Sequence, residues 1–319
     1  MTRVLVTGAT GFIGSVLCKA LVRADYLVRG ALRTDRAVPA AIAEKVIVGD
    51  INSTTDWTQA LQGVDLVIHA AARSHVLHPA RDSSNLYFET NERGTQHLAN
   101  VAAQTQVTRF IYLSSIKANG EESGARAYTP SDEPHPQDDY GLSKWHAEQH
   151  VAAVAGHTGI EAVIVRSPLV YGPGVRANFL RLLQWVEHGW PLPLGAVRNT
   201  RSLVNVWNLC DFLLLVLKHP SAPGRTWMVS DGEDLSTPDL IRRIGTAMGR
   251  RVRLLPVPVG LLQLSAGLVG RSGELARLCG SLAVDITQTR AELGWSPRAT
   301  VDEALARTVA WYLSRGSLR

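Results

Sequence analysis

Short apolar runs alternate with longer amphipathic stretches over the first half of the chain. Apolar runs bounded by polar or turn residues predict buried strands at 4–6, 27–32, 46–48, 66–68, 110–113 and 162–165. Helical spacing of apolar residues predicts helices over about 13–24, 56–62, 85–105 and 140–155. Strands that are apolar almost throughout are buried on both faces, which is typical of a parallel sheet between layers of helices. The pattern therefore predicts an α/β protein with a doubly wound parallel Rossmann sheet.

The rhythm changes after Tyr171, where proline and glycine become frequent and helical patterns dominate. We therefore expect a first domain over 1–170 and a smaller, mostly helical domain over 171–319. Apolar runs at 203–206 and 226–229 look like strands that return to the first sheet, so 203–230 is expected to rejoin the first domain. The apolar stretch 257–269 is too short to span a bilayer. It is expected to be a buried or capping helix, and a membrane-surface segment is the alternative.

Composition narrows the class of protein without fixing a partner. The chain has 319 residues, 45% of them hydrophobic and 19% charged, as is ordinary for a globular enzyme. A net charge of +5 would suit nucleic acid or anionic small molecules. Nucleic acid is disfavoured because the basic residues form no tract interleaved with aromatic residues. No signal peptide is expected, because the first predicted strand already begins at Val4.

Cysteine usage favours a reducing compartment. Cys18, Cys210 and Cys279 are odd in number and far apart, which predicts buried thiols in the cytoplasm rather than a disulfide framework. No histidine or cysteine cluster has metal-ligand spacing, so no metal site is expected.

Three glycines spaced G-x-x-G-x-x-G follow the first predicted strand directly. Gly8 permits the tight turn, Gly11 lets the backbone approach a phosphate, and Gly14 lets the next helix pack on the sheet. That helix, starting near Phe12, directs its N–H groups and positive dipole end at an anion. At the first strand–helix junction of a parallel sheet, the loop predicts a pyrophosphate site for a nicotinamide dinucleotide. The site is expected to include Gly8, Thr10, Gly11, Phe12, Ile13 and Gly14.

The end of the second strand favours NADP over NAD. An acid there would bind the ribose 2′-hydroxyl and repel a 2′-phosphate, but the chain has Ala31-Leu32-Arg33 and no acid from Arg29 until Asp35. Arg33 can pair with a 2′-phosphate through two N–H groups. Asp50, with its neighbour Ile51, follows the third strand and is expected to contact the adenine. NADP(H) is therefore the favoured cofactor, and NAD(H) is the alternative.

Tyr140 and Lys144 lie four residues apart, so they share one face of a predicted helix. A phenol, with a pKa of about 10, is a poor proton carrier at neutral pH. A nearby ammonium group favours the phenolate and lowers that pKa. Ser115 ends the fifth predicted strand and can donate to the same substrate oxygen. A solvated helix face would explain an isolated Tyr/Lys pair, but after a dinucleotide loop the pattern predicts a catalytic set.

Together these motifs resemble the extended short-chain dehydrogenase/reductase family of nucleotide-sugar epimerases, dehydratases and reductases. The resemblance runs nearly end to end. It rests on 7–14, 69–71, Asn91 with Gly94-Thr95, Ser114-Ser115, Tyr140 to Lys144, 166–172, 201–211 and 293–295.

The resemblance implies specific roles. Ser115, Tyr140 and Lys144 would be catalytic, with Lys144 also holding the nicotinamide ribose. Asn91 would support the active-site helix. The remaining implied cofactor contacts are His69, Ala70, Ala71 and Ser167. A cytoplasmic homodimer through the helices near 85–105 and 140–155, acting on a UDP-sugar, is the family expectation.

Candidate substrate residues follow from the same resemblance. Arg201 matches the family arginine that contacts the diphosphate, and Asn178 matches its substrate asparagine. Lys117 would bring a positive charge close to the sugar. Further candidates are Arg277 for the nucleotide, and Arg73 and His75 for the sugar pocket, with surface roles as the alternative. The turn 191–195 either lays its backbone against the uracil or is a tight connection.

Departures from the family pattern narrow the predicted reaction. Dehydratases carry an Asp-Glu pair where this chain has Ile116-Lys117, so dehydration is disfavoured. The segments 114–121, 168–174 and 177–179 look most like bacterial UDP-4-keto-6-deoxy-N-acetylhexosamine 4-reductases, which serve surface polysaccharide synthesis. We therefore predict reduction of the sugar C4 keto group.

Two other functions stay open. A UDP-sugar 4-epimerase with tightly bound NAD uses the same three catalytic residues. A non-catalytic dinucleotide sensor is the alternative of another class, and it is disfavoured because Tyr140 and Lys144 are both present. A steroid or flavonoid reductase is disfavoured by Asn178 and Arg201.

Overall fold

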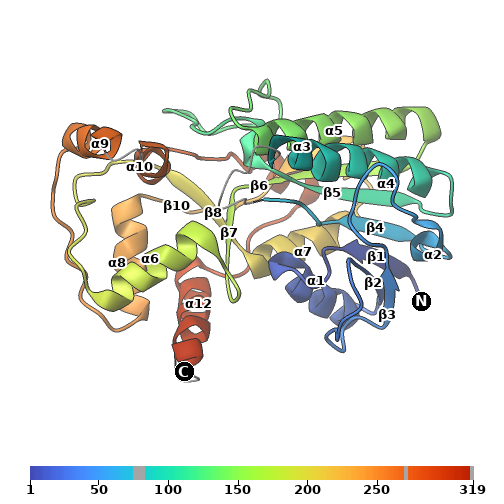
Figure 1. The fold of residues 1–319 in the computed structure, drawn as a ribbon, viewed down its shortest axis with the longest axis horizontal. Coiled ribbons are helices and arrows are strands. Elements are labelled where there is room, and N and C mark those ends of the chain that lie inside the picture. Colours follow the sequence, from blue (N-terminus) through green and yellow to red (C-terminus); the bar gives the residue numbers. More distant parts are fainter. Residues whose placement is uncertain (75–82, 269–271, 317–319) are drawn as a thin grey trace.

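A parallel sheet of seven strands forms the centre of the computed structural model, which describes residues 1–74, 83–268 and 272–316 (Figure 1). The strand order is β3-β2-β1-β4-β5-β6-β9, and each neighbouring pair is parallel. The chain runs outward from β1 to β3 and then crosses to β4, so the carboxyl ends of β1 and β4 flank the reversal point where such sheets bind ligands. The predicted doubly wound Rossmann sheet is confirmed. Its strands are β1 (Arg3–Thr7), β2 (Leu27–Leu32), β3 (Glu44–Ile47), β4 (Leu66–His69), β5 (Arg109–Ser115), β6 (Glu161–Ser167) and β9 (Arg225–Met228).

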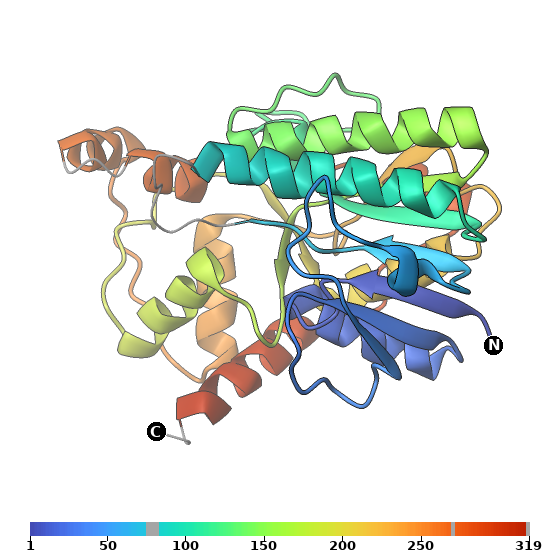
Figure 2. The same cartoon turned by 45° about the vertical axis from the view of Figure 1, so that its right-hand side comes forward.

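Side chains along these strands point alternately to the two faces of the sheet, and both faces are buried under helices. Ile111 and Leu113 pack in the core under α1 and α7, whereas Phe110 and Tyr112 pack in the core under α4 and α5. Figure 2 shows α4 and α5 side by side across one face. The helices of this part are α1 (Phe12–Arg23), α2 (Thr58–Leu61), α3 (Ser83–Tyr87), α4 (Gly94–Ala103), α5 (Asp139–Thr158) and α7 (Val206–Val216).

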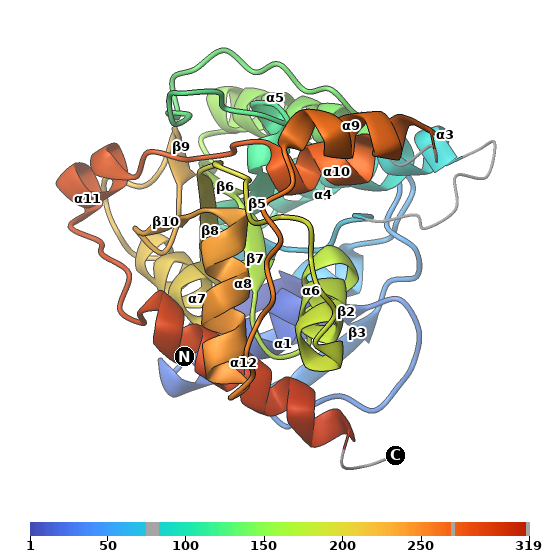
Figure 3. The same cartoon turned by 90° about the vertical axis from the view of Figure 1, so that its left-hand side faces the viewer.

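A second core lies beyond the carboxyl ends of the strands and is mostly helical. Its helices are α6 (Ala177–His188), α8 (Thr237–Ala247), α9 (Val259–Leu268), α10 (Ser272–Cys279) and α12 (Val301–Gly316), while α11 (Thr287–Leu293) lies beside the main sheet (Figure 3). Phe179, Ile241 and Leu305 are buried together in this core. Among the described residues, no helix combines the length and apolar composition that a membrane span requires.

The prediction that 203–206 returns to the main sheet is wrong. The strand there, β8 (Arg201–Asn205), forms a separate three-stranded sheet with β7 (Leu169–Tyr171) and β10 (Asp234–Leu235). β8 pairs in parallel with β7, and Leu203 lies opposite Leu169. Only β9 rejoins the main sheet, and α7 returns to pack on α1.

Two predicted helices also differ from the observed ones. The segment 85–105 is broken by a π-helical turn, Phe88–Arg93, between α3 and α4. The apolar stretch near 257–269 does form α9, but burial is confined to one side. Leu262 is buried, whereas Leu261 and Leu264 are exposed.

Candidate active site

The glycine loop is packed tightly at Gly8 and Gly14, where an added Cβ would lie less than 3.0 Å from backbone atoms. Gly8 has a φ of +68°, and a Cβ there would lie 2.9 Å from the backbone nitrogen of Ala71. A Cβ on Gly14 would collide with the carbonyl of Gly8. The loop therefore brings the end of β1, the start of α1 and the segment after β4 into close backbone contact, as in the glycine-rich turns that bind dinucleotides.

The first turn of α1 has N–H groups that no side chain caps. Gly11 occupies the N-cap in an extended conformation, makes no side-chain hydrogen bond to the helix and is exposed. Thr10 and Ile13 flank it and are partly buried. Uncapped N–H groups at the positive end of a helix fit a dinucleotide pyrophosphate.

The predicted adenosine contacts lie at the ends of β2 and β3. Arg33 follows β2 and is 3.7 Å from Asp50 (Nη1 to Oδ1), and both side chains are largely exposed. Ile51 packs against Gly94, where a Cβ would come within 2.7 Å of Ile51 Cγ2. The structure therefore brings Arg33 and Asp50 together beside the glycine loop, and the pairing leaves N–H groups of Arg33 available for an anion.

His69 lies in the interior, and its predicted role as a cofactor contact does not fit. Its side chain is buried, with Nδ1 2.7 Å from Thr7 Oγ1 and Nε2 2.9 Å from Thr95 Oγ1. Burial lowers the pKa of His69 to about 3, and the nearby Lys144 charge adds to this shift. The imidazole therefore fixes the ends of β1 and β4 to α4, while Ala70 and Ala71 remain next to Gly8.

Asn91 fastens the loop after β4 to α5, as the sequence predicted. From the π-helical turn, its Nδ2 donates to Ser143 Oγ at 3.1 Å and to the carbonyl of Arg73 at 3.0 Å. Its Oδ1 accepts from the backbone N–H of Arg73 at 2.8 Å. Arg73 is thus fixed through its backbone and exposes its side chain, while His75 lies outside the described residues.

Ser115 and Tyr140 meet at the carboxyl end of β5. The Tyr140 ring meets Tyr87 edge-to-face at 6.1 Å. Burial raises the pKa of Tyr140 to about 12, and the neighbouring Ser115 hydroxyl opposes this shift only in part. The predicted lowering by Lys144 is thus absent from the protein alone, and a further positive charge is needed to favour the phenolate.

Lys144 is buried against β5. Its Nζ donates to the carbonyl of Leu113 at 2.6 Å and lies 4.1 Å from the centre of the Tyr112 ring. Burial lowers the pKa of Lys144 to about 7, and Glu148 opposes that shift. The ammonium group is therefore poised to exchange a proton near neutral pH.

A buried ionic network behind Lys144 was not predicted from the sequence. Glu148 receives three hydrogen bonds from Arg166, the shortest 2.6 Å, and one from Ser114. Arg166 Nη1 also donates to Asn119 Oδ1 at 2.9 Å. An acid four residues after Lys144 on the same buried helix face was the available signal. Ser167, a predicted cofactor contact, is buried opposite Ser115 in the β5–β6 register.

Lys117 does not present a free charge to the substrate, contrary to expectation. Its Nζ is 2.5 Å from both Glu121 Oε1 and Asp138 Oδ2. Asp138 also caps α5 by accepting from the N–H of Gly141 at 2.7 Å. Lys117 therefore ties the 3₁₀ turn Ile116–Ala118, which follows Ser115, to the helix start that carries Tyr140.

Two of the candidate substrate arginines lie together, on the side of Glu121 away from Lys117. Arg201 Nη1 donates to the carbonyls of Arg277 and Gly280 at 2.8 and 2.9 Å. Arg277 Nε is 3.9 Å from Glu121 Oε2. Asn178 is exposed in the first turn of α6. Lys117, Glu121 and Arg277 thus form a row of charged side chains in contact, which leads from the turn after Ser115 to α10.

The turn 191–195 is a connection rather than a free backbone surface. Leu192 and Gly195 are hydrogen-bonded to Arg253 and Leu255, with N···O distances of 2.8 to 2.9 Å. These bonds fit a tight connection, one of the two expected roles of this turn.

Known proteins match this chain over nearly its whole length. Residues 4–230 match the model of the NAD dependent epimerase/dehydratase family. The chain is 41% identical to a UDP-glucose 4-epimerase of Vibrio cholerae, over 97% of this chain and 95% of that protein. It is 26% identical to an N-acetyl-α-D-glucosaminyl-diphospho-ditrans,octacis-undecaprenol 4-epimerase of Escherichia coli O157:H7, over 97% and 94%. The crystal structure of a UDP-glucuronic acid 4-epimerase from Bacillus cereus in complex with NAD superposes with a TM-score of 0.79 at 24% identity, over 98% and 99%.

Proposed function

This chain belongs to the NAD dependent epimerase/dehydratase family, and from that premise we propose that it is a UDP-sugar 4-epimerase that keeps its NAD bound. The observation that carries the proposal is the full-length similarity to the Vibrio cholerae UDP-glucose 4-epimerase. The meeting of Ser115, Tyr140 and Lys144 at one strand end supports it. The reductase predicted from sequence becomes the second candidate.

The proposed reaction inverts the configuration at C4 of the sugar by way of a 4-keto intermediate. NAD held by the glycine loop would supply the hydride acceptor for oxidation at C4 and, once reduced, the hydride donor for the reverse step on the other face of the ketone. Tyr140 accepts the proton of the C4 hydroxyl as the ketone forms and gives it back as the new alcohol forms. Ser115 donates a hydrogen bond to the same oxygen, and Lys144 exchanges protons with Tyr140.

The described residues divide between cofactor and substrate. The glycine loop and the open first turn of α1 would hold the pyrophosphate, and Lys144 would bind the nicotinamide ribose. Arg201 and Arg277, at the junction of β8 and α10, would receive the diphosphate of the sugar nucleotide. Glu121 contacts both Lys117 and Arg277, so its charge is shared between the Ser115 turn and the proposed diphosphate site.

The experiment is an epimerisation assay without added cofactor. Purified protein is incubated with UDP-glucose or UDP-N-acetylglucosamine, and the C4 configuration is followed by proton NMR. Denatured protein is then assayed for released NAD. Turnover with a stoichiometric amount of released NAD supports the epimerase. Absence of both would contradict it.

The 4-ketoreductase with NADP(H) remains a second candidate because of one residue. Arg33 stands where NAD-specific sites carry an acid, and its side chain is largely exposed. Its test uses a UDP-4-keto-6-deoxy-N-acetylhexosamine and NADPH. A gain of two hydrogens in the sugar, read by mass spectrometry, supports the reductase.

A further inference from the structure

The turn after Ser115 makes close backbone contact with the start of α5. A Cβ added to Gly141 would come within 2.5 Å of the carbonyl oxygen of Lys117. The backbone N–H of Lys117 also donates to Ser115 Oγ at 3.3 Å. The serine therefore accepts at the start of the 3₁₀ turn, and its own O–H remains able to donate to another oxygen. One residue thus orients the Ser115 hydroxyl and contacts the helical turn that carries Tyr140.

The side chain of Lys117 joins the same two segments a second time. Its ammonium group pairs with Asp138 Oδ2 at 2.5 Å, while Asp138 Oδ1 accepts from the N–H of Gly141 at 2.7 Å. Asp138 is therefore both the N-cap of α5 and the anionic partner of Lys117. The pair is only partly exposed, at 24% for the Lys117 side chain and 34% for Asp138, so water screens it less than a surface pair.

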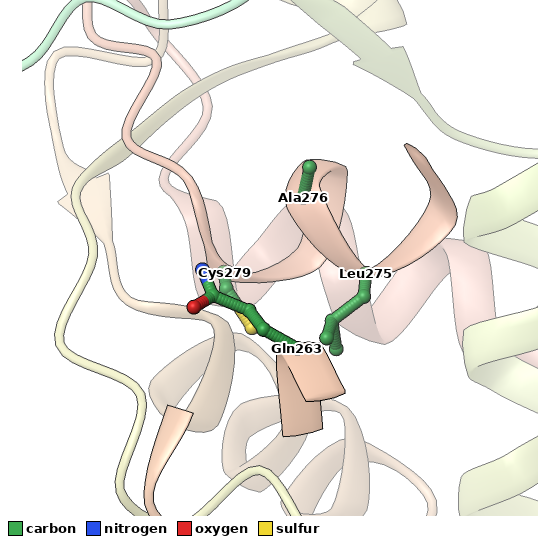
Figure 4. Close-up of a pocket in the computed structure, with 4 residues that line it drawn as sticks. All are labelled: Gln263, Leu275, Ala276 and Cys279. Carbon is green, nitrogen blue, oxygen red and sulfur yellow. The ribbon is translucent and has the colours of Figure 1, made fainter. Parts of the chain in front are cut away.

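Glu121 supplies a second carboxylate to Lys117 and is itself held from the other side. Its Oε1 lies 2.5 Å from Lys117 Nζ, and its Oε2 lies 3.9 Å from Arg277 Nε on α10. That helix packs on α9 around a shallow pocket, which Figure 4 shows and which is lined by Gln263, Leu275, Ala276 and Cys279. Two of the three N–H groups of the Lys117 ammonium are thus taken by carboxylates.

We propose that Lys117 is a positioning residue, which sets the separation of the Ser115 and Tyr140 hydroxyl groups through its ion pair with Asp138 and its backbone contact with Gly141. We call these two contacts the Lys117 clamp. Both hydroxyl groups must reach one substrate oxygen, and a misplacement of about 1 Å costs on the order of a hundredfold in rate. The proposal rests on the proposed roles of Ser115 and Tyr140, which 4-epimerisation and 4-keto reduction share.

The kinetic test compares two substitutions of Lys117. Lys117→Met keeps a long side chain without the charge, so it is expected to lower kcat by about tenfold or more while KM for the accepted sugar nucleotide stays within about twofold. Lys117→Arg retains a cation and should recover most of kcat. A higher KM with unchanged kcat in Lys117→Met would overturn the proposal, because that result would make Lys117 a substrate-binding residue.

A double-mutant cycle tests whether Lys117 acts through Asp138. Asp138→Asn keeps an oxygen that can cap α5 but removes the charge, so it should reproduce the loss of kcat. The combined variant should lose no more than about twofold beyond either single variant, because both changes break one ion pair. Losses that multiply would show that the two residues act separately and would contradict the proposal. Arg242→Met is the matched control, because Arg242 pairs at 2.7 Å with Asp239 in the first turn of α8 and should leave kcat and KM unchanged.

A further variant tests the backbone contact while keeping both charges. Gly141→Ala adds a Cβ against the carbonyl of Lys117, so it should lower kcat by about tenfold or more with KM within about twofold. Gly156→Ala adds a Cβ into open space in the same helix and should change neither constant. Normal kcat in Gly141→Ala would contradict the proposal.

A measurement without turnover separates the Lys117 clamp from the proposed function. Amide hydrogen exchange, read by mass spectrometry, reports on the backbone N–H groups of Lys117 and Gly141, which donate to Ser115 and Asp138. Exchange in peptides covering 116–121 and 138–144 should be faster in Lys117→Met than in the wild-type protein, and unchanged in Arg242→Met. A wild-type protein that turns over no sugar nucleotide would refute the proposed function, whereas unchanged exchange in Lys117→Met would overturn the Lys117 clamp whatever the activity.

Discussion

Glu148 and Arg166 form a buried ion pair one helical turn from Lys144, with 2.6 Å between Oε2 and Nη2. Both side chains are almost completely buried. The Glu148 charge raises the pKa of Lys144 against the larger effect of burial. The pair therefore contributes to the fold and also helps to keep Lys144 protonated.

Glu148→Gln is expected to lower the free energy of unfolding by about 3 kcal/mol, because it leaves the Arg166 charge buried without a partner. Urea denaturation measures the change. Glu292→Gln removes an acid from an exposed pair with Arg225 and should cost no more than about 1 kcal/mol. Equal losses in the two variants would show that burial adds nothing to the Glu148 pair.

Gly14→Ala should abolish dinucleotide binding and lower the free energy of unfolding by about 1–3 kcal/mol, because a Cβ there meets the backbone of Gly8. Gly156→Ala is the matched control. It lies in α5 with open space around its Cβ, so it should stabilise the protein by about 0.5–1 kcal/mol. Nucleotide content after denaturation and urea midpoints measure both effects. Retained nucleotide in Gly14→Ala would place the cofactor elsewhere.

His69 should make the protein less stable below neutral pH. Its pKa is about 3 in the folded protein and about 6.5 in an exposed histidine, so the unfolded chain binds more protons between those two pH values. The contribution of His69 to the free energy of unfolding is therefore fully present above pH 6.5 and is lost as the pH falls towards 3. Between pH 7.5 and 5 the loss from this group is about 2 kcal/mol. In His69→Gln the urea midpoint should fall less over that range, and parallel profiles would refute the assignment.

Tyr140→Phe should cut kcat by about two orders of magnitude or more, with the fold intact, because the proton carrier is lost. Tyr26→Phe removes another buried tyrosine hydroxyl, one without a hydrogen-bond partner in the described residues, and should leave kcat unchanged. Turnover of the accepted sugar nucleotide by NMR, with circular dichroism for the fold, measures both. Near-normal turnover in Tyr140→Phe would remove this residue from the mechanism.

Arg33→Asp should reduce NADPH affinity by about tenfold or more and leave NADH affinity within about threefold, since only the 2′-phosphate is repelled. Arg36→Asp makes the same charge change at another exposed position and should alter neither. Fluorescence titration of each cofactor measures the affinities. If Arg33→Asp and Arg36→Asp behave alike, Arg33 does not select the cofactor.

Features set by neighbouring residues were predictable from the sequence. The strand at Leu27–Leu32 and the glycine loop from Gly8 to Gly14 follow from local periodicity and turn geometry, and both are observed. The meeting of Ser115 with Tyr140 was predictable because the carboxyl end of a strand and the start of the helix that follows it lie at the same edge of a parallel sheet.

Features set by distant partners were not predictable. The sheet that β8 joins depends on its pairing with Leu169, and the charge of Lys117 is balanced by Asp138 from the start of another helix. Apolar composition alone could not tell which leucines of α9 face the core. In each case the outcome depends on a contact between residues that are far apart in the chain, or on which side of a helix finds a neighbour.

The wide turn at Phe88–Arg93 has a consequence for comparing chain lengths. A π-helical turn holds an extra residue relative to uninterrupted α-helix. Removing one residue there would rotate Asn91 by about 100° relative to one flanking helix, away from Ser143. An alignment of relatives should therefore show a one-residue gap wherever this turn is absent. The length of that segment then reports, from sequence alone, whether a relative can keep the Asn91–Ser143 bond.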